Sequence, residues 1–220
     1  MTQSSSALQS LQPGDPAPDF MLSMVQADRT VSLSDYRSKT GLFLGLFSGL
    51  YCPFCRRSIA QMAAYVDQLK PLGIETLGVV ATELENARLY YRFRPMRLPL
   101  AVDPALTTHR SYGVPKVEVT PEFLQATQEV RINPSGELPS PLPIMDASQE
   151  LNKIDGFQPT AADQRDAEQQ FPLLKGQFLI DRDGVIRWAN IECAREGLPG
   201  LGKFPTIEEL LPAAQLAASA

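Results

Sequence analysis

The stretch GLFLGLF at residues 41–47, followed by YCPFCRR at residues 51–57, decides the interpretation of this chain. The first segment is a short, nearly continuous apolar run, which is typical of a central strand buried on both faces. In the second segment, Pro53 suits the first position of a helix, which puts Cys52 at or near the N-cap. Together the two segments predict a strand that leads directly into a helix with a Cys-x-x-Cys pair at its start.

The spacing of this cysteine pair favours redox chemistry. Thiols three residues apart at a helix start lie on one face, close enough to form a disulfide. The amide groups of the helix N-terminus favour a thiolate at the first sulfur, and Arg56 and Arg57 would add positive potential. A thiolate is a nucleophile near neutral pH, and a neighbouring thiol can resolve a mixed disulfide or a sulfenic acid. The candidate catalytic residues are Cys52 and Cys55, and the candidate supporting residues beside them are Tyr51, Pro53 and Arg56.

Strands and helices alternate along most of the chain. The predicted strands cover residues 20–24, 30–32, 41–47, 76–81, 98–102, 177–181 and 185–190. The predicted helices run from Pro53 to about Leu69, over 83–94 and 104–112, and from a capping box at Thr206. This order predicts an α/β fold with a mixed central sheet flanked by helices, an N-terminal β-hairpin and a late hairpin whose turn is Asp183-Gly184.

The periodic pattern dissolves between residues 115 and 174, where prolines interrupt the sequence. Helices are expected there only at 121–129 and after Thr160. Structureless segments of this length are uncommon unless they are functional or disordered, so we expect an inserted subregion packed on the surface of the domain. The predicted organisation is one domain over residues 12–213 that contains this insertion, with loose termini at 1–11 and 214–220.

Composition and charge narrow the classes of partner. The chain has 220 residues, a formal net charge of −5 and a sequence pI near 5.0, and no strongly basic block. We therefore expect no nucleic-acid partner. The first basic residue is Arg29, so the charged start of a secretory signal is missing, and the uncharged stretch at 40–55 is shorter than the roughly 18 apolar residues of a membrane span. A cytoplasmic protein without a membrane partner is expected.

Few residues could hold a metal ion. A structural zinc site needs four ligands, and beyond the Cys-x-x-Cys pair the chain offers only Cys193 and His109. A glycine-rich phosphate loop in a strand-loop-helix context is also missing from the sequence. We therefore expect no metal or organic cofactor, a polar surface position for His109, and a packed or idle thiol at Cys193.

Three further segments carry a resemblance to a known family. GDPAPDF at 14–20 and VSLSDYR at 31–37 resemble the opening of the peroxiredoxin superfamily, which includes alkyl hydroperoxide reductase and thiol-specific antioxidant proteins. FLIDRDGVIR at 178–187 resembles the late hairpin of that superfamily. The likeness covers residues from about 14 to 113 and 175 to 212. It implies a thioredoxin fold and a thiol-dependent oxidoreductase or antioxidant activity.

The resemblance assigns roles in two different registers. In the peroxiredoxin pattern Pro-x-x-x-Thr-x-x-Cys, Ser48 takes the position of the proline, Cys52 that of the threonine and Cys55 that of the peroxidatic cysteine. The arginine of the pattern Arg-Gly-x-Phe falls on Lys175, which makes Lys175 a further candidate supporting residue.

In the thioredoxin register, Tyr51 stands where that family has tryptophan, Cys52 is the exposed attacking thiol and Cys55 the inner resolving thiol. The cis-proline position of thioredoxins falls on Lys175, and the position of their buried acid falls on Leu46. The chain thus resembles a peroxiredoxin-like scaffold that carries a thioredoxin-like dithiol.

These observations predict a thiol-disulfide oxidoreductase that cycles through a Cys52–Cys55 disulfide. The expected partners are a disulfide or peroxide substrate and a thioredoxin-like or low-molecular-weight thiol reductant. One alternative is a peroxiredoxin-type hydroperoxide reductase in which Cys55 is the peroxidatic thiol. Another is a redox-responsive binding module whose recognition surface is the insertion. The quaternary state stays open, although members of the superfamily commonly form homodimers.

Overall fold

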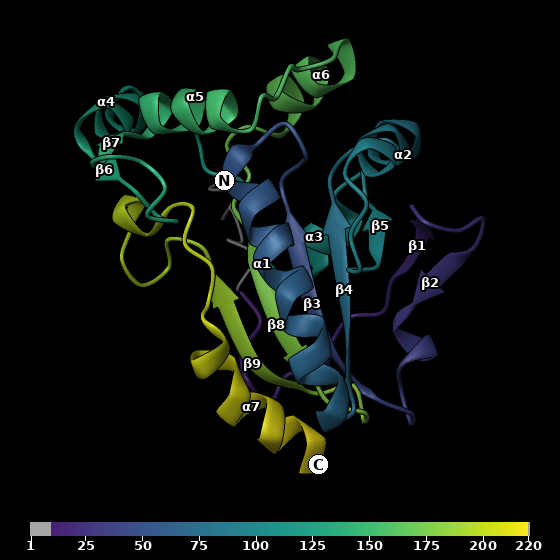
Figure 1. The fold of residues 1–220 in the computed structure, drawn as a ribbon. Coiled ribbons are helices and arrows are strands. Elements are labelled where there is room, and N and C mark those ends of the chain that lie inside the picture. The colour runs from purple at the N-terminus through teal and green to yellow at the C-terminus, as the bar shows by residue number, and fades with distance from the viewer. Residues whose placement is uncertain (1–9, 220) are drawn as a thin grey trace, which may run out of the picture.

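The structure is a computed structural model that describes residues 10–219, and its centre is a seven-stranded mixed sheet (Figure 1). The strands follow one another across the sheet in the order β2-β1-β5-β4-β3-β8-β9. Strands β3, β4 and β5 are parallel, whereas β1, β2, β8 and β9 pair antiparallel with their neighbours. Their bounds are β1 (Met21–Met24), β2 (Thr30–Ser32), β3 (Gly41–Phe47), β4 (Ile74–Val80), β5 (Leu100–Val102), β8 (Gly176–Ile180) and β9 (Ile186–Ile191).

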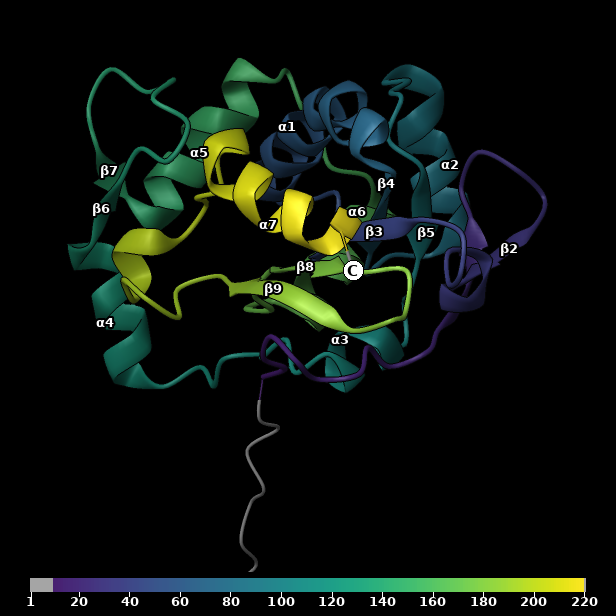
Figure 2. The ribbon, with the colours of Figure 1, turned by 90° about the horizontal axis from the view of Figure 1, so that it is seen from below.

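Helices cover both faces of this sheet. Figure 2 shows α1, α2 and α7 on one side of the sheet and α3 on the other. The central strand β3 is buried along its whole length, because Phe43 and Phe47 pack under α1 while Leu44 and Leu46 enter the core on the opposite face. The helices are α1 (Pro53–Leu69), α2 (Leu84–Phe93), α3 (Thr107–Ser111) and α7 (Ile207–Ser219), with short 3-10 turns at Leu33–Asp35, Lys70–Leu72 and Leu198–Gly200.

The segment from 115 to 174 has more regular structure than its sequence predicts. It forms α4 (Pro121–Glu129), β6 (Arg131–Ile132), β7 (Leu142–Pro143), α5 (Ile144–Ile154) and α6 (Ala161–Gln170). The sequence predicted α4 and α6, but it did not predict α5 or the two-stranded β6-β7 sheet. Helix α5 begins directly after a proline-rich stretch and buries Ile144, Ala147 and Leu151 beside Phe54 of α1. Figure 1 shows α4, α5 and α6 beyond the end of β3 at which α1 begins.

Two expectations about particular positions are wrong. Residues 214–219, expected to be a loose terminus, continue α7, because Ala214 and Ala217 are buried against the sheet. His109, expected at the surface, is fully buried and lies 3.2 Å from both Asp103 Oδ2 and the carbonyl oxygen of Phe47. Residues 1–9 of the loose segment expected at the N-terminus lie outside the described residues.

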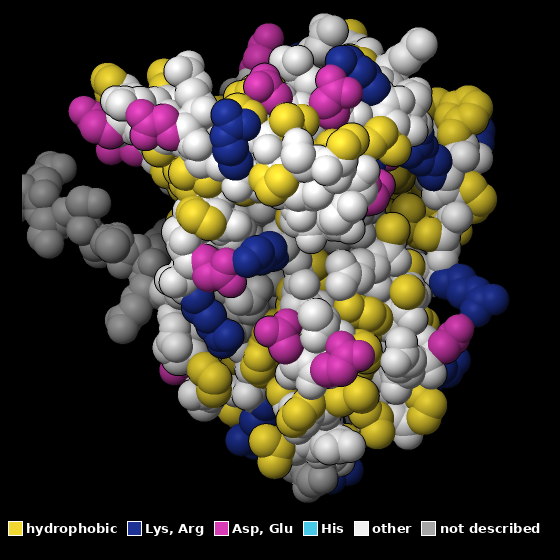
Figure 3. All heavy atoms as spheres, turned by 60° about the vertical axis from the view of Figure 1, so that its left-hand side comes forward, with side chains coloured by type: hydrophobic (Ala, Val, Ile, Leu, Met, Phe, Trp, Pro, Cys, Tyr) yellow, Lys and Arg dark blue, Asp and Glu magenta, His cyan; other side chains and the backbone are white. Residues whose placement is uncertain are grey.

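The surface carries mixed charge. On the molecular face in Figure 3, acidic and basic side chains are interspersed with apolar ones, and neither sign dominates a large area. Among residues 10–219, no helix combines the length and the apolar character needed to cross a membrane.

Candidate active site around Cys52 and Cys55

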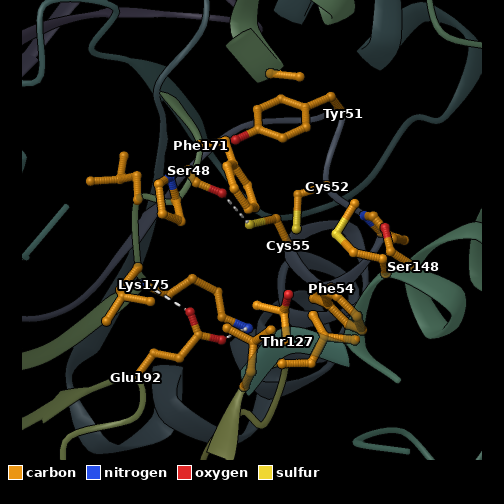
Figure 4. A pocket seen from close by; sticks show the side chains of 18 of the residues that line it. Ser48, Tyr51, Cys52, Phe54, Cys55, Thr127, Ser148, Phe171, Lys175 and Glu192 are labelled. Atoms are coloured by element: carbon orange, nitrogen blue, oxygen red, sulfur yellow. Dashed lines mark hydrogen bonds and ion pairs between the residues drawn. The ribbon is translucent and has the colours of Figure 1, made fainter. Parts of the chain in front are cut away.

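The start of α1 positions both cysteines. Cys52 is the extended N-cap residue of α1, Pro53 occupies the first turn as predicted, and the amide of Arg56 donates to the carbonyl of Cys52 over 3.1 Å. Cys55 lies inside the first turn and is 1% exposed, while Cys52 is partly exposed, and both thiols are free. Figure 4 shows the two side chains next to each other. The predicted juxtaposition of two thiols at a helix start is therefore present.

The environment of Cys55 stabilises a thiolate on this residue. Ser48 Oγ lies 3.1 Å from Cys55 Sγ, within reach to donate a hydrogen bond to it. Burial acts to raise the pKa of Cys55, but a hydrogen bond from the Cys52 thiol, the positive charge of Lys175 and the Ser48 hydroxyl outweigh burial and lower the pKa to about 6. The pKa of Cys52 is raised, first because its thiol is held in the hydrogen bond to Cys55 and then by burial. The directions of the two pKa shifts favour a Cys52 thiol next to a Cys55 thiolate in the reduced site.

Lys175, the residue directly before strand β8, brings the positive charge to this site. Its ammonium is buried, with the residue 1% exposed, and it lies 3.0 Å from Glu192 Oε1 and 3.0 Å from Ser58 Oγ. Burial acts to lower the pKa of Lys175, but Glu192 and then the Cys55 thiolate raise it above its ordinary value. Lys175 therefore stays charged beside the sulfurs.

Glu192 is a site residue that the sequence analysis missed. Its carboxylate accepts from the Gly202 amide over 2.7 Å and from the Lys175 amide over 3.1 Å, in addition to the ammonium contact. A signal for it exists in the sequence: Gly176 pairs with Ile191 in the late hairpin, so the next opposed positions are Lys175 and Glu192. The strand register thus places opposite charges face to face at the open end of the hairpin.

Arg56 does not play the predicted electrostatic part. Its buried guanidinium donates to the carbonyls of Leu50 and Tyr51 over 2.9 and 3.1 Å and forms an ion pair of 2.6 Å with Asp155. Arg57 is paired with Asp155 and with Glu137. The expectation that these arginines add positive potential at the sulfurs is wrong, because acidic residues of the insertion neutralise both of them. Arg56 instead fixes the loop before Cys52 and joins it to the insertion.

The remaining predicted positions have distinct environments. Tyr51 lines the space in front of the cysteines, and burial raises its pKa, so its phenol is neutral. Leu46, at the position of the thioredoxin acid, is fully buried in the core. A cis peptide bond joins Phe171 and Pro172. The thioredoxin register placed the cis-proline at Lys175, three positions after Pro172.

An apolar cavity of about 570 Å³ opens in front of the dithiol. The core of the domain supplies Ser48, both cysteines and Lys175 to its lining, and the insertion supplies much of the wall through α4, α5, α6 and the segment that follows α6. The insertion, expected to pack on the surface of the domain, also encloses the space above the sulfurs. The lining residues from the insertion are Val119, Phe123, Thr127, Ile144, Met145, Ser148, Ala167, Glu168, Phe171, Pro172, Leu173 and Leu174.

Cys193 is separate from this cavity. It lines a second, more polar hollow of about 650 Å³, and burial raises its pKa to about 12, so that it is a thiol at neutral pH. Within residues 10–219, no group of three or more His, Cys, Asp or Glu side chains could hold a metal ion.

Comparison with known proteins finds one relative in sequence and several relatives in fold. The chain is 26% identical over 124 residues to the thiol-disulfide oxidoreductase ResA of Halalkalibacterium halodurans, a match that covers 56% of this chain and 69% of ResA. Three solved structures share the fold. A 2-Cys peroxiredoxin of Plasmodium vivax gives a TM-score of 0.57 at 14% identity, covering 92% of this chain and 79% of that one. The peroxidoxin BcpB of Mycobacterium tuberculosis gives 0.56 at 13% identity, covering 95% and 97%.

A putative thiol:disulfide interchange protein DsbE of Chlorobium tepidum gives a TM-score of 0.54 at 22% identity, covering 96% of this chain and all of that one. The α/β fold with its mixed sheet is therefore thioredoxin-like. The sequence model of the AhpC/TSA family matches residues 13–189, a span that includes the insertion as well as the cysteine helix. The chain belongs to the AhpC/TSA family.

Proposed function

We propose that this protein is a thiol-dependent oxidoreductase that reduces disulfides and cycles through a Cys52–Cys55 disulfide. The observation that carries the proposal is the placement of two free cysteines at the start of α1, where Lys175 and Ser48 support an ionised Cys55. The name of ResA, a relative across just over half of this chain, supports the same reaction class. Such a pair provides a nucleophile and a resolving thiol from one helix turn.

The disulfide reaction starts from one thiol and one thiolate. Because Cys52 is the more exposed sulfur, it attacks the substrate disulfide after its proton has moved to Cys55 along their hydrogen bond. A bond forms between Cys52 and one substrate sulfur, and the other leaves as a thiolate that takes the proton from Cys55. The Cys55 thiolate then attacks Cys52 Sγ and expels the second substrate thiolate. Two electrons pass from the dithiol to the substrate, and a thiol reductant restores the pair.

Reduction of hydroperoxides is a second candidate, favoured by the ionised sulfur at Cys55. This residue occupies the peroxidatic position of the family, and its pKa of about 6 makes it a thiolate at neutral pH. Its attack on a peroxide oxygen would break the O–O bond and give a sulfenic acid and an alkoxide that takes a proton from water. Cys52 would then attack the sulfenic sulfur, lose its proton and release hydroxide, so that the same disulfide forms.

Single substitutions of the cysteines test the proposed cycle. With bis(2-hydroxyethyl) disulfide as substrate and dithiothreitol as reductant, both Cys52→Ser and Cys55→Ser are expected to lose catalysed turnover. Treated with the disulfide after dithiothreitol has been removed, Cys55→Ser should accumulate a mixed disulfide on Cys52, because the resolving sulfur is missing. Mass spectrometry of intact and digested protein detects this adduct and, in the unsubstituted protein, the Cys52–Cys55 bridge.

Cys193→Ser is the matched control and should keep full turnover, since Cys193 lies outside the cavity. If Cys52→Ser keeps full disulfide turnover, or if no bridge forms under oxidation, the proposed cycle is incorrect. If turnover occurs only with hydroperoxide and depends only on Cys55, the second candidate replaces the first.

A further inference from the structure

The cavity in front of the dithiol suits a particular kind of disulfide. We infer that the preferred substrate is a polypeptide disulfide in which a large apolar or aromatic side chain neighbours the reacting cysteine and no acidic residue flanks it. This inference rests on the proposed function, because it assigns a substrate class to the same pair of sulfurs.

The shape and lining of the cavity provide the first argument. Its volume of about 570 Å³ falls within the range of about 300–1,000 Å³ that is common for ligand sites. Its lining is mostly apolar: Phe54 and Leu198 contribute from outside the insertion, and Phe123, Ile144 and other apolar residues contribute from the insertion. One side chain of a substrate could enter this space while the attached disulfide meets Cys52. Figure 4 shows Phe171 on the same side of the cavity as the sulfurs.

The charges of the cavity provide the second argument. Among the described residues, Lys175 is the one cation that lines the cavity, and its ammonium is already held in an ion pair with Glu192. Glu168, which is exposed on α6, adds a carboxylate for which the described residues show no ion pair. An anionic substrate, such as a fatty-acid hydroperoxide or a disulfide flanked by carboxylates, would meet negative charge without a free cation. A neutral or basic polypeptide has the complementary charge.

The rim of the cavity indicates a substrate larger than a small molecule. Val119, Met145 and Phe171 line the cavity, and yet they are 50%, 47% and 40% exposed. Partly exposed apolar side chains gathered around an opening mark surfaces that a partner covers. They come from three different segments of the insertion, before α4, within α5 and after α6. A polypeptide that reaches the sulfurs would bury these side chains, whereas a small peroxide would leave them in water.

The test compares three short neutral-ended peptide disulfides that differ only in the residue before cysteine: phenylalanine, serine or glutamate. Turnover is followed with dithiothreitol as reductant, and linoleic acid hydroperoxide serves as the alternative occupant. We expect kcat/KM for the phenylalanine peptide to exceed that for the serine peptide by about tenfold, equivalent to about 1.4 kcal/mol. The glutamate peptide should be the slowest of the three.

Introducing a negative charge at the rim of the cavity tests whether the rim causes the preference for the phenylalanine peptide. Val119→Glu and Met145→Glu should each bring the ratio of the phenylalanine to the serine peptide close to one. Leu124→Glu is the matched control, because Leu124 is 47% exposed on α4 but does not line the cavity, and it should keep the ratio of the unsubstituted protein. Circular dichroism confirms that each variant is folded, which is expected because the substituted side chains are half exposed.

The possible outcomes separate this inference from the proposed function. Equal turnover of the phenylalanine and serine peptides would overturn the inference and leave the disulfide reductase in place. A preference that survives both rim variants would also overturn it, as would a higher kcat/KM for the fatty hydroperoxide than for any peptide. If bis(2-hydroxyethyl) disulfide is turned over but none of the peptide disulfides is, only the inference is incorrect. If neither the small disulfide nor any peptide is turned over, the proposed function is incorrect as well.

Discussion

Replacing Lys175 with methionine is expected to reduce the ionised fraction of Cys55 at pH 7 by roughly tenfold or more. A thiol with a pKa of about 6 is roughly 90% ionised at this pH, whereas an ordinary cysteine with a pKa of about 8.5 is roughly 3% ionised. Methionine removes the positive charge beside the sulfurs and leaves the buried carboxylate of Glu192 without its ammonium partner. Both changes raise the pKa of Cys55. The absorbance of the reduced protein at 240 nm, titrated with pH, measures the effect.

A double variant separates this charge effect from damage to the fold. In Lys175→Met/Glu192→Gln both members of the ion pair are neutral, so no uncompensated charge is buried. Lys175 lowers the pKa of Cys55 by more than Glu192 raises it. The pKa of Cys55 should therefore be highest in the single variant, intermediate in the double variant and lowest in the unsubstituted protein. A Cys55 pKa that is the same in all three proteins would show that Lys175 does not stabilise the thiolate.

The second large effect is expected at Arg56. We expect Arg56→Met to lower the free energy of unfolding by about 3 kcal/mol, near the low end for breaking a buried ion pair, because Asp155 keeps Arg57 as a partner. The substitution also removes the donors to the carbonyls of Leu50 and Tyr51 and the contact with the Phe157 ring at 4.0 Å. Denaturant unfolding followed by circular dichroism measures the loss.

Arg97→Met is the control for this prediction. Arg97 and Asp67 form an ion pair of similar length, 2.8 Å, but both side chains are more than 70% exposed. Its removal should cost less than about 1 kcal/mol, as is usual for surface pairs. Equal losses for Arg56→Met and Arg97→Met would contradict the assignment of Arg56 as the buried link between the cysteine loop and the insertion.

The central part of the fold can be predicted because the residues that specify each element lie within that element or directly beside it. The run at 41–47 and the proline after Cys52 define β3 and the start of α1 within one short stretch. Helix α4 is predicted for the same reason, since Thr120 caps it and Pro121 opens it. Helix α5 escapes prediction because its three buried apolar positions follow directly on a proline-rich stretch, and only packing against Phe54 of α1 shows that they form one face.

The predictions about the site fail where a residue's role depends on a contact with a residue far away in the sequence. Arg56 was expected to serve the sulfurs, but its partner Asp155 lies 99 positions away in a segment without a clear pattern. Lys175 could be predicted from the family pattern, whereas Glu192 required the exact pairing of the late hairpin, which has an irregularity between Leu179 and Ile180. The cavity could not be predicted, because it exists only once the insertion folds back over the dithiol.

Observing the ionisation of each cysteine separately tests whether Cys55 is the thiolate of the pair. Reduced protein labelled with 13C at the cysteine β-carbons would be titrated by NMR between pH 4 and 10, with signals assigned from the single serine variants. We expect Cys55 to titrate with a midpoint of about 6, while Cys52 remains a thiol well above that pH. Cys52 ionising before Cys55, or neither thiol ionising below about pH 8, the range of an ordinary cysteine, would contradict this expectation.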